Sequence, residues 1–488
     1  MMKRLPKGAA QRGPQERYAA GRRAGLVLAV LMLGGCTVGP EYRVPALSLP
    51  TDWGTESAAA RETAVPELSR WWTELDDPTL NGLIERASGQ NLDLAAARAR
   101  IREARASYRQ AGGALQPSLD GSGSTGLAGS DNSIDGQFQA GFDASWELDI
   151  FGGRKRRVEA AAYGVGAAEE DLRDTMLTLI GDIASNYVSA RSFRARIDLA
   201  RRTAISMRET ESLTRARFRA GATAASDMAN AAGQASSTEA NIPALEVSFA
   251  EAVHRLGVLT GQAPGALAAM LRNGAPIPRP TRPIPTGVPA DILLTRPDVR
   301  GAERELARYT ALIGEAEAAR YPSVSLTGSI ATSGTSIGDL AKGSSIGWAI
   351  GPSLTVPIFN GGQLEAAVDL ARAQRDQFEA AFRSTVLTAL EDVENAIVAL
   401  AQERIRNRSL AEASESYREA ARLARSLYGA GSISFLDVLD AERSLYSAED
   451  ALLQSTARIA TGYVTLNKAL GGGWDGVLET AAAAPASG

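Results

Sequence analysis

The stretch GQFQAGFDASWELDIFGG, residues 136–153, decides the fold class of this chain. Its even-numbered positions carry apolar side chains, namely Phe138, Ala140, Phe142, Ala144, Trp146, Leu148 and Ile150. The odd-numbered positions between them are polar or small. Because successive side chains of a β-strand point to opposite faces, the pattern predicts a strand with one apolar and one polar face.

A second stretch of this kind, SIGWAIGPSLTVPIFNGG, occupies residues 345–362. Its apolar face would carry Ile346, Trp348, Ile350, Leu354, Val356 and Ile358. Matches at offsets that drift from 205 to 210 residues link the two halves of the chain: Asp93 with Asp298, Phe151 with Phe359, and Gly221 with Gly431. The chain therefore contains two internal repeats, each reading helix, β-hairpin, very long helix, tight turn, helix.

The repeats set the expected division of the chain. We expect a signal peptide at 1–35, an extended segment at 36–76, a first repeat at 77–274 with its hairpin at 116–151, a proline-rich connector at 275–289, a second repeat at 290–472 with its hairpin at 321–359, and a flexible tail at 473–488. The prolines of the connector cannot continue a helix and favour an extended chain.

Long helices follow the predicted strands. No proline interrupts residues 118–242 or 358–484, and residues 154–219 alone would form a rod of about 100 Å at ~1.5 Å per residue. Apolar residues recur there at spacings of three and four, and again in the second repeat: Leu172, Met176, Leu179, Ile183, Ala190, Phe193, Ile197, Ala200, Ala204 and Met207, then Val386, Leu390, Val393, Ile397 and Leu400. Such spacing predicts helices that pack lengthwise against neighbours, as in coiled coils.

The N-terminus resembles a lipoprotein signal. Seven basic residues precede the apolar run 24–33, and small residues lead to Cys36, which would be acylated as the first residue of the mature chain. The alternative is an ordinary secretory signal that ends near a cysteine. Cys36 is the only cysteine, so disulfides are excluded. The formal net charge of −4 becomes more negative without the signal, which argues against a nucleic-acid partner.

The two-faced strands point to a membrane. Beyond the N-terminus no stretch reaches the ~18 to 20 apolar residues of a spanning helix, whereas the strands exceed the ~9 to 11 residues of a tilted membrane strand. A small amphipathic sheet on a soluble helical domain is the alternative. In lipid, however, four strands would leave two unpaired edges, and membrane barrels need about eight strands or more. Several copies would therefore have to pool their hairpins.

Four motifs carry a family resemblance. They are the segment after Cys36, Thr37-Val38-Gly39-Pro40-Glu41-Tyr42; Trp71-Trp72 with Asp76-Asp77-Pro78 and Leu80; Arg296-Pro297-Asp298-Val299-Arg300 with Ala302-Glu303; and the strand ends Ile-Phe-Gly-Gly and Ile-Phe-Asn-Gly-Gly. Together they resemble the TolC-like outer-membrane efflux family, in its lipoprotein (OprM/NodT-type) branch of tripartite RND-type pumps. The resemblance covers nearly the whole mature chain.

The resemblance implies an α+β membrane protein. In such a homotrimer, twelve strands form an outer-membrane β-barrel, four from each chain, and twelve helices continue it as a periplasmic α-barrel. Phe-Gly-Gly would mark the change from strand to helix, where glycine absorbs the change of backbone direction. The partners implied are a periplasmic adaptor (membrane fusion) protein, an inner-membrane transporter of RND type and outer-membrane lipid.

The resemblance places a gate beyond the second tight turn. Asp437 and Asp440 match acidic ring positions, and Leu436 matches an apolar constriction; Asp437 alternatively caps a helix N-terminus. Some family members carry in this turn an arginine that ties the gate shut, and Ile433 occupies its position. The adaptor-docking tips would be Gly221, Ala222 and Thr223 in the first repeat and Gly431, Ser432 and Ile433 in the second.

Two further groups of charges have candidate roles. Asp143, Glu147 and Asp149 would line the lumen, or else hydrate an exposed sheet. Arg154, Lys155, Arg156 and Arg157 would contact lipid phosphates, or else form a solvated basic turn. One histidine and one cysteine leave no usual catalytic or metal cluster, so we expect no enzyme, no metal and no cofactor.

The resulting interpretation is a lipid-anchored outer-membrane exit duct that extends into the periplasm and passively conducts small molecules out of a tripartite efflux system. Two alternatives remain: an outer-membrane conduit for protein secretion, and a non-conducting structural envelope lipoprotein that uses its long rods as spacers.

Overall fold

The computed structural model describes residues 37–47, 68–130, 133–281 and 295–474. The expected signal peptide at 1–35, Cys36, and residues 475–488 of the tail expected at 473–488 lie outside this part. The chain forms two compact units, each assembled from separate stretches of sequence. The first unit contains the described residues of 1–44, 103–165 and 304–379, and the second contains those of 45–102, 166–303 and 380–488.

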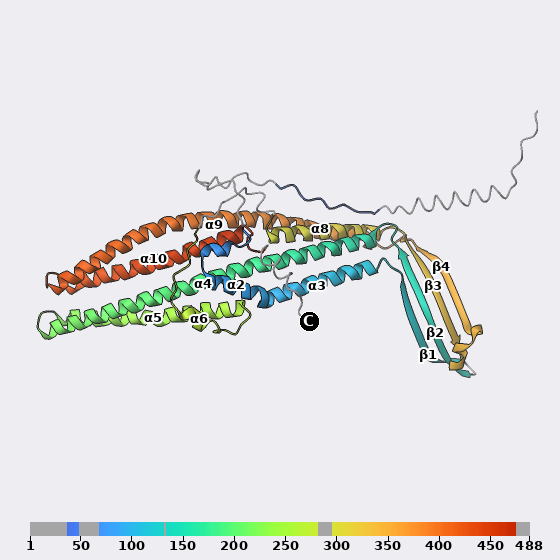
Figure 1. Cartoon of the computed structure of the whole chain (residues 1–488). Coiled ribbons are helices and arrows are strands. Elements are labelled where there is room, and N and C mark those ends of the chain that lie inside the picture. The colour runs from blue at the N-terminus through green and yellow to red at the C-terminus, as the bar shows by residue number, and fades with distance from the viewer. Residues whose placement is uncertain (1–36, 48–67, 131–132, 282–294, 475–488) are drawn as a thin grey trace, which may run out of the picture. The chain divides into compact units, whose positions relative to one another are not determined.

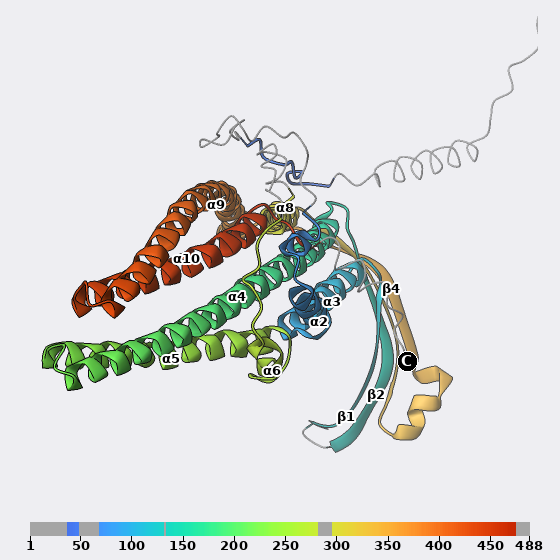
Figure 2. The same cartoon turned by 60° about the vertical axis from the view of Figure 1, so that its left-hand side comes forward.

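The first unit contains a four-stranded antiparallel sheet with strand order β1-β2-β3-β4 (Figures 1 and 2). The strands are β1 (Ser118–Ser130), β2 (Ser133–Leu148), β3 (Ser323–Gly334) and β4 (Ile346–Thr355). Two short 3-10 helices, η2 (Ile337–Ala341) and η3 (Gly343–Ser345), connect β3 to β4. The two predicted hairpins thus join edge to edge through β2 and β3.

The register places the large apolar side chains on one face of this sheet. Phe142 of β2 pairs with Ile330 of β3, which pairs in turn with Trp348 of β4. Residues paired across antiparallel strands point to the same face, so the three side chains form one apolar row. The neighbouring row contains Asp143 and Ser329. The two-faced pattern predicted from the alternation is confirmed in β2 and β4, and β3 between them follows it.

Strands β2 and β4 both end earlier than the sequence suggested. β4 ends at Thr355, so Val356 and Ile358 do not belong to the strand's apolar face. Pro357 explains the end, because proline has no backbone N–H to donate to a ladder. Likewise β2 ends at Leu148, and Ile150 follows it outside the ladder. Gly152 then adopts a positive φ of 77° where the chain turns into the next helix.

The predicted long helices are confirmed. α4 (Gly153–Arg219) and α9 (Gln363–Gly429) each have 67 residues. They are followed by α5 (Ala225–Leu259) and α10 (Phe435–Ala469), of 35 residues each. Figures 1 and 2 show α4 beside α5 and α9 beside α10. The remaining helices are η1 (Trp71–Leu75), α2 (Pro78–Gln90), α3 (Leu92–Gly113), α6 (Ala268–Arg272) and α8 (Pro297–Ala318).

The largest core lies in the second unit, around η1 and α2. Trp72, Leu80 and Ile84 are fully buried there against Met176, Ile183 and Tyr187 of α4. The heptad positions predicted on α4 continue this core as a buried seam that includes Ile197, Ala200, Ala204 and Met207. Their apolar packing joins α4 lengthwise to its neighbours, as the spacing predicts.

In the part of the chain that the structure describes, every helix lacks an apolar stretch long enough to span a membrane.

Candidate functional site: the helix tips

Each helical hairpin of the second unit turns through a glycine. Gly221 and Gly431 have φ angles of 72° and 77°, a left-handed conformation that glycine adopts without steric strain. The N–H after each glycine donates to the carbonyl oxygen five residues earlier: Ala222 N to Arg217 O at 2.8 Å, and Ser432 N to Leu427 O at 2.9 Å. These bonds satisfy carbonyl groups at the helix ends in the Schellman arrangement. Both predicted tight turns are therefore present.

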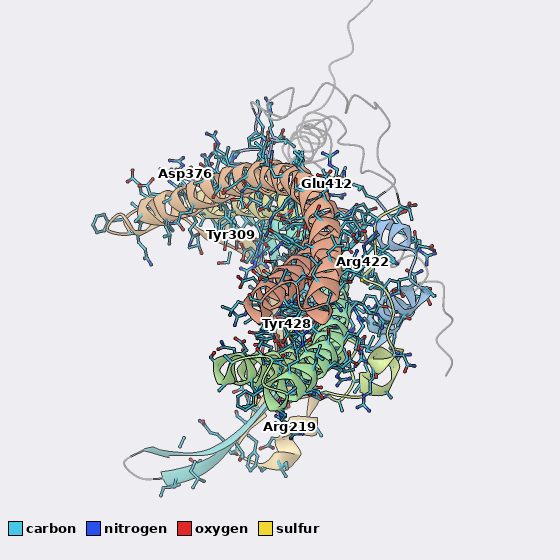
Figure 3. All side chains as sticks on the ribbon, turned by 90° about the vertical axis from the view of Figure 1, so that its left-hand side faces the viewer. Arg219, Tyr309, Asp376, Glu412, Arg422 and Tyr428 are labelled. Carbon is cyan, nitrogen blue, oxygen red and sulfur yellow. The ribbon has the colours of Figure 1, made fainter. Side chains whose placement is uncertain are left out.

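The first turn of α10 separates buried from exposed residues. Phe435, Val438 and Leu439 are buried in the hairpin, whereas Leu436, Asp437 and Asp440 are exposed. Leu436 keeps 52% of its surface exposed although it is a large apolar residue. The helical spacing thus brings the three gate candidates to one side of the helix start. Figure 3 looks toward this end of the hairpins, near the labelled Tyr428.

The two gate aspartates are in different environments. Oδ2 of Asp437 accepts hydrogen bonds from the N–H and the hydroxyl of Ser434, at 2.9 and 2.7 Å, which forms a capping box. The capping role weighed for Asp437 is thus present in the structure. Asp440 forms no hydrogen bond or ion pair with any described residue and leaves its carboxylate exposed. Its position in the first repeat is occupied by the uncharged Asn230.

An arginine that the sequence analysis did not single out links the two tips. Nη2 of Arg217, near the end of α4, donates to the carbonyl oxygen of Gly429 at 3.3 Å. Its guanidinium lies 4.3 Å from the ring centroid of Tyr428, within the range of a cation–π contact. Ile433 packs partly buried against the cluster around Tyr428. The only sequence signal was the repeat offset of 210, which aligns Arg217 with the uncharged Leu427.

A buried carboxylate lies just behind the gate candidates. Glu442 of α10 is 4% exposed, and its Oε1 lies 2.7 Å from Nε of Arg425 on α9. The pair has the distance of an ion pair without the alignment of a hydrogen bond. Burial raises the pKa of Glu442 above its ordinary value, while the charge of Arg425 lowers it and that of Glu449 raises it.

The basic turn of the first unit, residues 154–157, divides into two kinds of residue. Arg156 is 5% exposed, and its guanidinium binds Glu159 and the carbonyl oxygens of Val38 and Gly39. Arg154 donates to the carbonyl oxygen of Ala114 and to Glu147. Lys155 and Arg157 are exposed. All four cations shared one candidate role on the basis of sequence. The structure shows that they differ in burial and in their partners.

The three candidate lumen carboxylates differ in the same way. Asp143 is exposed on the polar face of β2, where it pairs in register with Asp120 of β1. Glu147 binds Arg154. Asp149 lies beyond β2, and its two oxygens accept the N–H groups of Arg154 and Lys155 at 3.0 and 2.8 Å. Its charge faces the positive N-terminal end of the α4 dipole.

Among the described residues, no three or more His, Cys, Asp or Glu side chains come together in a way that could hold a metal ion. The charged groups near the tips instead form pairs between helices, as Arg425 does with Glu442, form pairs within one helix, as Arg215 does with Glu211, or remain exposed, as Asp440 does.

Comparison with known proteins agrees with this geometry. The family model described as "Outer membrane efflux protein" matches residues 83–262 and 288–472, which is most of the chain and includes both repeats. The chain belongs to the outer membrane efflux protein family. This family comprises outer-membrane channel proteins and not enzymes, so the resemblance, the fold class and the outer-membrane localisation drawn from the sequence are confirmed.

Individual relatives cover nearly the same length. Nodulation protein T of Rhizobium leguminosarum bv. trifolii is 37% identical over 92% of this chain and 97% of its own. The toluene efflux pump outer membrane protein TtgI of Pseudomonas putida is 32% identical over 92% of this chain and 97% of its own. The open state of the Neisseria gonorrhoeae MtrE outer membrane channel superposes with a TM-score of 0.80 at 31% identity, over 90% of this chain and 99% of that one.

Proposed function

We propose that this outer-membrane efflux protein is the exit duct of a tripartite pump, and that it conducts small molecules passively. The observation that carries the proposal is the register of the sheet, which gathers Phe142, Ile330 and Trp348 on one face and polar or small residues on the other. A sheet with these two faces fits between lipid and water. Energy would come from an inner-membrane transporter of RND type, reached through a periplasmic adaptor protein.

The dimensions of the apolar face support insertion in a bilayer. On β2 it extends from Phe138 to Leu148. Ten steps of ~3.4 Å at a tilt of about 45° span about 24 Å, close to the ~25 Å apolar band of outer-membrane proteins. β1 and β4 are the edges of the sheet. Because lipid offers no hydrogen-bond partner to an edge, three copies would pool twelve strands into one closed sheet.

The gate in this proposal lies at the start of α10. Asp440 is an exposed carboxylate without a partner among the described residues, and Leu436 exposes its side chain beside it. Three copies of each around a threefold axis would form a negative ring and an apolar constriction. Asp437 contributes less to the ring, because Ser434 already binds its carboxylate. The glycine turns at Gly221–Thr223 and Gly431–Ile433 would dock the adaptor.

Lipid contacts follow from the first unit. Lys155 and Arg157 are exposed beside the end of β2, where lipid phosphates would lie if the strands cross the bilayer. We assign the phosphate contact to Lys155 and to Arg157, which stays 66% exposed although it binds Glu315. Arg156 is excluded because it is buried and its guanidinium is bound within the chain. Acylation of Cys36 would add a hydrophobic anchor at this end of the strands.

Single-channel recordings in planar bilayers test the duct and its gate. Asp440→Asn removes the ring charge without changing side-chain size, and we expect conductance to rise several-fold. Asp437→Asn retains an oxygen for the cap, so we expect a smaller rise in conductance. Asp227 occupies the position of Asp437 in the first repeat, 210 residues earlier, and Asp227→Asn is the matched control. Unchanged conductance of Asp440→Asn would remove the gate assignment, and a purified oligomer that carries no current would contradict the duct.

A deletion strain separates the duct for small molecules from a conduit for protein. We expect loss of the gene to increase susceptibility to toxic small molecules and to leave the secreted proteins unchanged. Complementation with the wild-type chain should restore resistance. The reverse result, a changed secretome with unchanged susceptibility, would favour protein secretion.

A further inference from the structure

The first residues of the described chain pack onto the junction between β2 and α4. We call residues 37–42 the strap. The N–H of Val38 donates to the carbonyl oxygen of Phe151 at 3.1 Å, so the strap pairs with backbone that has just left the sheet. Further along the strap, the ring of Tyr42 meets the ring of Tyr163 on α4 edge to face, with centroids 5.9 Å apart.

A buried arginine holds the strap from the side of α4. Nε of Arg156 donates to the carbonyl oxygen of Val38 at 3.2 Å, and Nη2 donates to that of Gly39 at 3.3 Å. Nη1 donates to Glu159 at 2.8 Å. The guanidinium of an arginine that is only 5% exposed requires such partners. Two of its three nitrogen atoms therefore bind strap carbonyls, and the third binds the carboxylate that balances its charge.

Close backbone contacts hold the strap from the other side. Gly39 adopts a φ of 90°, and a Cβ at this position would lie 2.3 Å from the Cα of Gly314 on α8. Gly152 has a φ of 77°, and a Cβ there would lie 2.7 Å from Cγ2 of Thr37. Only glycine accommodates either contact without a shift. Four elements thus meet at one point: the strap, the end of β2, the start of α4 and α8.

We propose that Arg156 is a positioning residue for the lipid anchor. By holding the strap, it fixes Thr37, the residue bonded to Cys36, at the junction where the apolar face of β2 ends. Consecutive Cα atoms are ~3.8 Å apart, so an acyl group on Cys36 would be tethered one residue away from that junction. The acyl chains and the sheet then enter the same leaflet side by side. The proposal rests on the proposed acylation of Cys36 and membrane insertion of the strands.

The protein would attach to the membrane in two ways, through the acyl anchor and through the strands. Docking of the strap changes how strongly these two attachments cooperate. When the strap is held, the anchor and the strands form one rigid unit, and insertion of one places the other at the membrane surface. When it is released, a longer and flexible stretch of chain joins them. The effective concentration of the second attachment falls as such a tether lengthens. Arg156 therefore acts on anchoring through the strap, without touching lipid.

Spin labelling of the full-length acylated protein tests this role. Glu41 is exposed in the strap, and Cys36 is the only cysteine of the chain. Acylation consumes the thiol of Cys36, so Glu41→Cys supplies the only free one. We expect an immobile label with a fixed membrane depth, measured by its relaxation with oxygen and with a water-soluble nickel chelate. Arg156→Gln should shorten the rotational correlation time several-fold and scatter the depth. Arg308→Gln, at an α8 arginine that pairs with Glu305 on its own helix, should change neither.

Gly39→Ala provides an independent disruption of the same contact. The added Cβ would strike Gly314 while Arg156 stays intact, so label mobility should rise as in Arg156→Gln. If Arg156→Gln fails to fold, Arg156→Lys is measured instead, because a single ammonium group cannot reach both strap carbonyls and Glu159. Mobility that is already high without these changes, or that is unaffected by either Arg156 variant, would overturn the proposal. A non-conducting oligomer with an immobile strap would refute the duct and leave this inference standing.

Discussion

The hairpin formed by α4 and α5 and the hairpin formed by α9 and α10 have the same body and different tips. Both pair a helix of 67 residues with one of 35. An arginine on the first helix binds a glutamate on the second in both: Arg208 with Glu239, and Arg418 with Glu449. These pairs are 210 residues apart, so the repeat retains both the backbone and the side-chain contact.

The tips of the two hairpins differ in their helix caps and in the ion pairs that their charged side chains form. α10 begins with a side-chain cap from Ser434, whereas Ala224 at the start of α5 supplies none. Arg425 binds a glutamate across the hairpin, whereas its counterpart Arg215 binds Glu211 on its own helix. The tip of the α9–α10 hairpin therefore has both a helix cap and an ion pair between its helices. It also carries the exposed acidic residues. Specialisation of the repeats is concentrated in the last turns of the helices.

The largest change in stability should come from placing in α10 the proline that α5 contains. Pro243 lies inside α5, and Leu453 occupies its position in α10, packed partly buried against a core cluster that contains Val188. Leu453→Pro should destabilise α10 by about 3 kcal/mol or more, because proline removes a helix hydrogen bond and clashes with the preceding turn. Amide hydrogen exchange along α10 should accelerate accordingly.

The reverse exchange is the control. Pro243 is exposed, so Pro243→Leu should leave α5 unchanged or slow its exchange. If Leu453→Pro left the exchange of α10 unchanged, the two hairpins would be interchangeable at this level, and the second hairpin would not depend on an unbroken helix.

A smaller loss should follow removal of the arginine behind the gate. Arg425→Ala leaves the carboxylate of Glu442, which is 4% exposed, without its cation. Breaking a buried pair costs ~3 to 5 kcal/mol, and because Arg425 is 46% exposed we expect about 1 to 3 kcal/mol. Arg215→Ala is the matched control with a smaller expected effect, because Arg208 still binds Glu211. Thermal unfolding and amide exchange at the tips would distinguish the two variants.

The same pair predicts a pH dependence of definite sign. Burial raises the pKa of Glu442 in the folded chain above its ordinary value of 4.5. The folded state thus binds this proton more tightly than the unfolded state, so the contribution of this group is greatest below pH 4.5 and is lost as the pH rises through the folded pKa. In Arg425→Ala the pKa should rise further, and the deficit should shrink between pH 7 and pH 5. A deficit that grows on acidification would contradict the assignment.

Sequence patterns were sufficient where a structure depends on neighbours in the chain. Alternation predicted both faces of the sheet, heptads predicted the α4 seam, and glycine predicted both turns. The pattern failed at Val356 and Ile358, where Pro357 ends the ladder although the alternation continues. The register between the two hairpins also lay beyond the pattern, since β2 and β3 come from different repeats.

Single charges were harder to assign than elements. The four cations of residues 154–157 look alike in sequence, yet Arg156 is buried because carbonyl groups more than a hundred residues earlier bind it. Asp437 could equally be a gate or a cap until its distance to Ser434 was known. Such roles depend on contacts between distant segments, and no local pattern encodes them.

A smaller change in helix stability should follow from altering the N-terminal caps of α10 and α5. Ser434→Ala removes the hydroxyl of the capping box and should destabilise the first turn of α10 by about 1 kcal/mol. Ala224→Ser, the reverse change, should stabilise the start of α5 by a similar or smaller amount, because Thr223 already binds the nearby Asp227. Amide exchange at the two helix starts measures both. Equal exchange before and after each change would mean that the cap does not distinguish the tips.

The smallest effect is expected from the pair of contacts that the repeats share. Arg208 binds Glu239 with two hydrogen bonds at the surface, and these bonds lower the pKa of Glu239. Because the folded pKa lies below the ordinary value, any stabilisation is present above pH 4.5 and is lost as the pH falls through the folded pKa. Glu239→Gln and Glu449→Gln should therefore each cause a slight loss at pH 7 in low salt, and ~1 M salt should abolish it, since exposed charges are screened. If one of the two losses survived high salt, the bodies of the hairpins would differ as their tips do, and the repeat symmetry would end well before the last turns.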